Sequence, residues 1–189
     1  YYYQYKPKTD SMLPPFEAYA MISGTQHYMA FDKKFFEFAG SCSYTLAREF
    51  VSQTFEVLVN YDNDREVSRK SITVRTEGKE VEIASNGVVS VDGAQTELPV
   101  EFGAVQITRD GHMILLRSAK GFGVSCDVAN DMCMLNISGW YFNKVAGLFG
   151  TYTNEPSDDL LTSTARQASD MREFTHSWVS GSCRSIENR

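Results

Sequence analysis

The feature that most constrains the fold is a series of short apolar runs with a period of two. In 54–60, the side chains of Phe55, Val57 and Val59 fall on one face of an extended chain. The segments 72–74 and 81–83 repeat this spacing. Because successive side chains of a β-strand point to opposite faces, the pattern predicts half-buried strands.

Turn signals separate these runs at short intervals. Asn86-Gly87, Asp92-Gly93 and Asp110-Gly111 each predict a tight hairpin turn with positive φ at both of its residues. A further hairpin is expected within 123–137. The sequence therefore predicts a mainly β fold, with antiparallel strands in a sandwich or a rolled sheet.

One segment near the carboxyl end has helical spacing. Met171, Phe174 and Trp178 lie on one face of a helix, and either Ser169 or Asp170 can cap its amino end. We expect a short C-terminal helix that docks this face on the sheet.

Length and composition indicate a single globular domain. The 189 residues are 42% hydrophobic, and we expect a linker arm at 1–17 and one domain at 18–189. The net charge of -6 argues against a nucleic-acid partner, which requires a concentrated basic face. No apolar run approaches the roughly 20 residues that a transmembrane segment needs, so none is predicted.

Four cysteines allow three disulfide pairings. Cys126 and Cys133 are close enough in sequence for a local bridge, which leaves Cys42 with Cys183; the alternative is four buried thiols in a cytosolic protein. A glycosylation sequon begins at Asn136. The sequon and the even cysteine count favour an oxidising, extracellular setting.

An acidic loop at 147–160 is the candidate ligand site. Gly147, Gly150 and Pro156 interrupt regular structure there, and Asp158 and Asp159 are adjacent carboxylates. Such a loop can supply the several oxygen ligands that calcium needs. The alternative is a solvated acidic turn.

No catalytic motif is present. The three histidines, His27, His112 and His176, lie outside any H-E-x-x-H or C-x-x-C-H pattern, and there is no G-x-S-x-G elbow. We therefore predict that the chain is not an enzyme.

Four sequence blocks in order resemble the von Willebrand factor type D domain. They are Gly24-Thr25-Gln26-His27-Tyr28-Met29-Ala30-Phe31-Asp32, Cys42-Ser43-Tyr44-Thr45-Leu46-Ala47, Gly147-Leu148-Phe149-Gly150 with the acidic pair at 158–159, and 174–178 followed by Cys183. The resemblance covers about 19–183 and implies the fold expected above.

The chain departs from this family at one disulfide. Ala20 and Phe149 stand where family members usually have two cysteines that bond to each other. The loss of both partners together is consistent with the resemblance, and it leaves Cys42–Cys183 as the surviving family bridge.

The resemblance also implies a calcium site made by the aspartate that ends the first block and by the loop after the glycine turn. Threonines replace the usual Asn or Asp at two loop positions, so we expect weakened binding, with Asn154 or Glu155 compensating. The implied ligands are Asp32, Thr151, Thr153, Asn154, Asp158 and Asp159.

Within the family, the amino-acid sequence of 146–156 is most similar to that of insect apolipophorin, followed by vitellogenin. This resemblance implies a non-enzymatic structural and interaction module of a secreted lipid-transport protein in haemolymph or yolk. Its expected partners are other domains of the same carrier, a lipid particle or a cell-surface receptor. The alternative is a calcium-tuned adhesion or clotting module of an extracellular multidomain protein.

Overall fold

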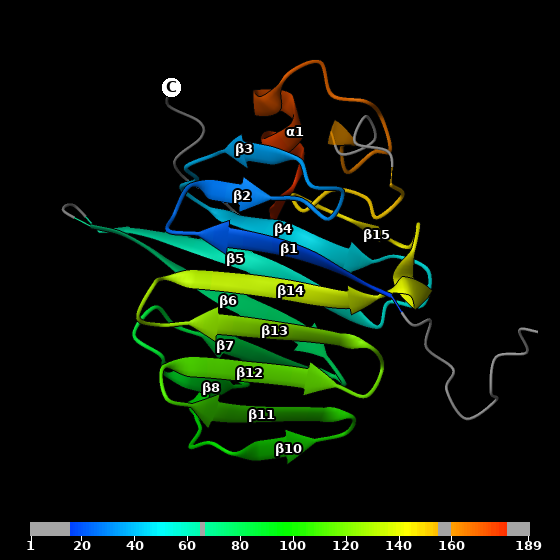
Figure 1. Ribbon diagram of the computed structural model, residues 1–189. Coiled ribbons are helices and arrows are strands. Elements are labelled where there is room, and N and C mark those ends of the chain that lie inside the picture. The colour runs from blue at the N-terminus through cyan, green and yellow to red at the C-terminus, as the bar shows by residue number, and fades with distance from the viewer. Residues whose placement is uncertain (1–15, 65–66, 155–159, 181–189) are drawn as a thin grey trace, which may run out of the picture.

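The computed structural model describes residues 16–64, 67–154 and 160–180 (Figure 1). Two antiparallel sheets pack face to face, and a short helix covers one end of the sandwich. The predicted mainly β fold with a short C-terminal helix is confirmed. The predicted domain boundaries stay a prediction, because 1–15 lie outside the described residues.

The first sheet carries the amino-terminal strands on one side and the central strands of the chain on the other. Its spatial order is β10 (Val100–Phe102), β11 (Val105–Asp110), β12 (Met113–Ser118), β13 (Phe122–Asp127), β14 (Met132–Ser138), β1 (Glu17–Ser23), β2 (His27–Met29) and β3 (Phe35–Glu37).

The second sheet runs in nearly sequential order. It consists of β15 (Val145–Ala146), β4 (Ser43–Glu49), β5 (Phe55–Asp64), β6 (Val67–Thr76), β7 (Lys79–Ile83), β8 (Val89–Val91) and β9 (Ala94–Gln95), with β16 (Val179–Ser180) also paired to β4. The helical elements are η2 (Gly139–Tyr141) and α1 (Met171–Ser177).

The predicted apolar faces form the core between the sheets. Phe55, Val57 and Val59 on β5 are at most 2% exposed. The ring of Phe55 stacks on that of Phe122 from β13, with centroids 4.4 Å apart, so the two sheets are in direct contact here. Each such buried side chain contributes roughly 1.5–3 kcal/mol through removal from water.

The turns differ in detail from the prediction. Asp92 (φ 51°) and Gly93 (φ 84°) are both left-handed, as expected. At the other two dipeptides only the glycine has positive φ. Asp110 is the last residue of β11 and pairs with Met113, so the central residues of that turn are Gly111 and His112.

The Asn86-Gly87 loop is longer than the predicted two-residue turn: the N–H of Ala84 bonds to the carbonyl of Val88 at 2.9 Å, and three residues, 85–87, lie between this pair. The N–H of Gly87 bonds to the carbonyl of Ala84, and Gly87 then takes φ 86°. A turn followed by one left-handed residue is a common hairpin solution for this loop length.

The helix α1 begins as its sequence predicts. Asp170 accepts the backbone N–H of Glu173 at 2.8 Å, and the Glu173 carboxylate returns to the N–H of Ser169 at 2.8 Å. This reciprocal pair satisfies two amino-terminal donors. Phe174 and Trp178 are buried, as predicted, and place the helix on the end of the sandwich.

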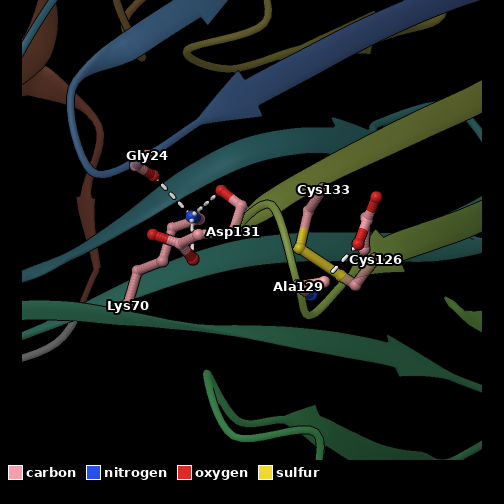
Figure 2. Close-up of a disulfide and its surroundings, with 7 residues drawn as sticks. Gly24, Lys70, Cys126, Ala129, Asp131 and Cys133 are labelled. Atoms are coloured by element: carbon pink, nitrogen blue, oxygen red, sulfur yellow. Dashed lines mark hydrogen bonds and ion pairs between the residues drawn. A yellow bond between two sulfur atoms is a disulfide. The ribbon is translucent and has the colours of Figure 1, made fainter. Parts of the chain in front are cut away.

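A buried lysine in the first half of β6 joins the two sheets. The side chain of Lys70 is 2% exposed, and its Nζ donates to the carbonyl of Gly24 and to both the carbonyl (2.8 Å) and the carboxylate (2.7 Å) of Asp131 (Figure 2). Burial lowers the pKa of Lys70, and the Asp131 carboxylate offsets part of that effect. Gly24 and Asp131 belong to turns of the first sheet, so this ammonium group ties those turns to β6.

Within the described residues, no helix has the length and apolar character needed to span a membrane.

Candidate metal centre

The glycine turn that precedes the acidic loop is seated on an irregularity in β4. The β4–β5 register shifts between Thr45 and Ala47, and the carbonyls of Thr45 and Leu46 accept the N–H groups of Leu148 (3.0 Å) and Phe149 (2.8 Å). Gly147 is needed for this approach, because a Cβ there would lie 2.3 Å from the Leu46 oxygen. The bulge in β4 therefore fixes where the loop begins.

The same turn reaches the block that ends in Asp32. The carbonyl of Phe149 accepts the N–H of Phe31 at 3.0 Å, and their rings meet edge to face with centroids 6.0 Å apart. Phe149 and Ala20, which replace the family's two cysteines, are both fully buried in the apolar core. Backbone pairing and aromatic packing thus bring Asp32 to the loop without that disulfide.

The Asp32 carboxylate is bound by the first residues of the loop. One oxygen accepts the N–H (3.2 Å) and the hydroxyl (3.4 Å) of Thr153, and the other accepts the N–H of Asn154 (3.1 Å). Asn154 has φ 61°, a left-handed conformation that turns its N–H toward the carboxylate. Burial, together with the nearby negative charge of Asp32, raises the pKa of Tyr152.

Part of the predicted ligand set is therefore assembled. Asp32, Thr153 and Asn154 meet, and Thr151 is buried next to them, with its carbonyl 3.0 Å from the Thr153 N–H. Asp158 and Asp159 lie outside the described residues. Among the residues that are described, no group of three or more His, Cys, Asp or Glu side chains could hold a metal ion.

The donor set fits calcium in one respect. A carboxylate has about four lone-pair sites, and Asp32 uses three of them for Thr153 and Asn154. The remaining site and the threonine hydroxyl are hard oxygen donors of the kind that calcium takes. The loop backbone fixes the position of the Asp32 carboxylate.

The cysteines form at least one local bridge. Cys126 on β13 and Cys133 on β14 face each other across the hairpin and are disulfide-bonded, with their Cα atoms 4.1 Å apart (Figure 2). Cys42 also takes part in a disulfide. Its predicted partner, Cys183, lies outside the described residues, so that pairing stays a prediction.

The sequon lies on a central strand of the first sheet. Asn136 on β14 is half-buried between Gly123 on β13 and Tyr19 on β1. The sequon hydroxyl, that of Ser138, accepts the N–H of Trp140 at 3.3 Å and is part of the cap of η2. Glycosylation of Asn136 stays a prediction.

The sequence patterns did not reveal the role of Glu49. This side chain is 1% exposed, and its carboxylate accepts backbone N–H groups from Val51, Ser52 and Thr54. The available signal is local: an acidic residue at a strand end is followed by a short segment rich in Ser and Thr. The Glu49 carboxylate organises the loop that follows β4.

Comparison with known proteins identifies the family. A von Willebrand factor type D domain model matches residues 20–166. The apolipophorins of Locusta migratoria are 32% identical over 186 residues, which is 97% of this chain and 5% of that protein. Apolipophorin of Galleria mellonella is 31% identical over 95% of this chain and 12% of its own length.

Relatives outside the apolipophorins also match. Alpha-tectorin of Mus musculus is 32% identical over 84% of this chain and 8% of its own length. The chain thus spans only a small part of each of these long proteins. The family predicted from the four sequence blocks is confirmed, and the chain belongs to the von Willebrand factor type D domain family.

Proposed function

We propose that the chain is a non-enzymatic structural and interaction module of a secreted lipid-transport protein. The observation that carries this proposal is the similarity to apolipophorins over 97% of the chain, although the chain covers 5% of that relative's length. A small β-sandwich within a much longer lipid carrier acts by contact with its neighbours. Other domains of the same carrier are its first expected partners.

Secretion is part of the proposal. The Cys126–Cys133 disulfide supports an oxidising compartment such as haemolymph. A vitellogenin-like carrier in yolk is the finer alternative within this class, and a cell-surface receptor is a further expected partner.

The experiment follows the endogenous polypeptide. An antibody raised against the 189-residue chain is used to probe body fluid separated by density-gradient centrifugation. We expect it to detect a polypeptide many times longer than the chain, in fractions that float with lipid and sink after delipidation. Detection only in lipid-free fractions contradicts the lipid-carrier assignment.

The second candidate function is a calcium-tuned adhesion or clotting module, which the match to alpha-tectorin favours. Detection of the long polypeptide in a lipid-free matrix or clot, by the same antibody, supports this alternative.

Calcium binding is proposed for either function. Asp32 and the hydroxyls and backbone of the loop would supply hard oxygen ligands, and the ion would cross-link the first block to the loop. The proposed ligands are Asp32, Thr151, Thr153, Asn154, Asp158 and Asp159.

A chelator should lower the melting temperature of the chain, and Asp158→Ala should abolish the difference. Asp32→Asn is the matched variant: its single amide oxygen can still accept the N–H of either Thr153 or Asn154, which bond to different carboxylate oxygens in the unmodified chain, while the charge is lost. An identical melt with and without chelator contradicts calcium binding.

A further inference from the structure

β14 ends and η2 begins at the right-hand side of Figure 1. The segments that meet at this end carry exposed apolar side chains. The backbone N–H of Phe50 bonds to the carbonyl of Lys144, and the N–H of Gly139 bonds to the carbonyl of Phe16, so three distant segments meet here. We call their exposed apolar residues the end patch. Its members, each 41–60% exposed, are Phe16, Phe50, Val51, Trp140 and Phe142.

The loop that carries part of the end patch is held in a fixed shape. The buried carboxylate of Glu49 accepts the N–H groups of Val51 (2.6 Å), Ser52 (2.8 Å) and Thr54 (2.9 Å). Burial raises the pKa of Glu49, but the donors from Thr54, Ser52 and Val51 outweigh burial and leave the pKa below its usual value. The ionised carboxylate thus fixes the backbone of a loop in which Phe50 and Val51 are exposed.

The η2 segment is fixed in a similar way. The hydroxyl of Ser138 caps the N–H of Trp140, and the hydroxyl of Tyr141 donates to the carbonyl of Lys120 at 2.6 Å. Trp140 remains 52% exposed although its own N–H and the side chain of the next residue are both hydrogen-bonded. A contiguous group of large exposed apolar side chains marks an interaction site.

The charges around Trp140 indicate the chemistry of that partner. The Nζ of Lys144 lies 4.3 Å from the centre of the Trp140 ring. Both side chains, with Lys120, line an open groove of about 280 Å³. Lys120 pairs with Glu77 at 2.8 Å, whereas Lys144 has no carboxylate partner within the part of the chain that the structure describes.

The acidic side chain in the groove wall is Glu49, whose charge is already bound by backbone donors. Within the described residues, a chain with a net charge of -6 thus presents a cation without a carboxylate partner beside an exposed tryptophan. Trp and Lys side chains combine an apolar body with a polar tip, the combination favoured at a lipid–water interface. Lysine ammonium groups there complement anionic phosphate.

We propose that the end patch docks on a phospholipid surface, with Trp140 and Phe50 at headgroup level and Lys144 on the lipid phosphates. This inference deepens the proposed function, on which it rests, by giving the module a direct contact with lipid.

The test uses the 189-residue chain with phosphatidylcholine vesicles, with and without about one fifth phosphatidylserine. Trp178 is 4% exposed, so a change in tryptophan emission on adding vesicles reports on Trp140. We expect a blue shift and co-sedimentation with vesicles. Trp140→Ala should weaken binding at least about tenfold, and Lys144→Gln should weaken binding to the anionic vesicles alone by about fivefold.

The matched control is Phe35→Ala, since Phe35 on β3 is 75% exposed but lies outside the end patch. It should bind as the unmodified chain does. Trp140→Phe, which keeps an aromatic ring, should retain most of the binding, so that loss in Trp140→Ala can be separated from misfolding. The absence of binding to both vesicle types, or equal losses in Phe35→Ala and Trp140→Ala, overturns the proposal.

Two other occupants would give distinct results. A blue shift that appears with protein concentration and without vesicles, together with dimers in sedimentation, would identify a second copy as the occupant. A blue-shifted emission that is present without vesicles and is lost on removal of residues 1–15 would identify the arm as the occupant. Either result overturns lipid docking. A chain that floats in native lipid fractions but does not bind vesicles overturns this inference and leaves the proposed function standing.

Discussion

Replacing Lys70 by methionine tests whether one buried ammonium group stabilises the junction between the sheets. The substitution keeps the length of the side chain but removes the three hydrogen bonds that the lysine donates to Gly24 and Asp131. A hydrogen bond to a charged partner contributes roughly 1.5–3 kcal/mol. The Asp131 side chain is 50% exposed and can be hydrated once the lysine is gone, and its carbonyl still accepts the Gly24 N–H at 2.9 Å.

These partial compensations place the expected loss at about 2–3 kcal/mol, below the 3–5 kcal/mol typical of a fully buried broken pair. Urea denaturation of the oxidised protein measures the free energy of unfolding directly. For a chain of this size the loss corresponds to a fall in melting temperature of roughly 4–12 °C. Lys79→Met is the matched control, because Lys79 is 43% exposed and its 3.4 Å pair with Asp92 should contribute less than about 1 kcal/mol.

The reasoning would be refuted if Lys70→Met were as stable as the unmodified chain. That result would mean that desolvation of the ammonium group outweighs its three bonds, as occurs in some buried ion pairs that tolerate apolar replacement.

Three further changes probe other parts of the domain. The pKa of Glu49 is depressed in the folded state, so its contribution to the free energy of unfolding should be full above the unfolded-state pKa of about 4.3 and should be lost as pH falls through the folded-state pKa. Glu49→Gln should remove that part of the pH dependence in urea titrations and should cost about 1.5–3 kcal/mol at pH 7. Gly147→Ala should cost about 3 kcal/mol from its contact with β4, measured against Gly93→Ala, which has open space and should cost only about 1–2 kcal/mol. Asp170→Ala should lower the free energy of unfolding by about 1 kcal/mol, whereas Asp170→Asn, which can still cap α1, should be nearly neutral.

The strands could be predicted because their apolar alternation is local. Phe55, Val57 and Val59 reach the core as expected, and Phe174 does so from the helix. The role of Lys70 was missed although its signal was present: it stands at the same period-two spacing as Ile72 and Val74, which places a lysine in an inward register. Its acceptors come from turns of the other sheet, which no local pattern connects to β6.

The candidate site depends even more on distant contacts. The approach of Asp32 to the loop rests on the backbone bond between Phe31 and Phe149 and on the bulge at Leu46. Neither has a local sequence signature, so the residues of the loop alone predicted only an acidic turn or a ligand loop. The family resemblance supplied the link between Asp32 and Thr153, and the structure supplied its physical basis.

The outer edge of β4 has a consequence for the order of folding during synthesis. That edge is completed by β15, by the glycine turn and by β16, all of which come from the last third of the chain. Until those residues leave the ribosome, β4 presents unpaired N–H and C=O groups, which can pair with other chains. The second sheet can form its β5–β9 part early, but a nascent chain that stops before residue 145 leaves the whole edge of β4 exposed as a template for misassembly, and one that stops before β16 leaves its Ser43–Tyr44 end exposed.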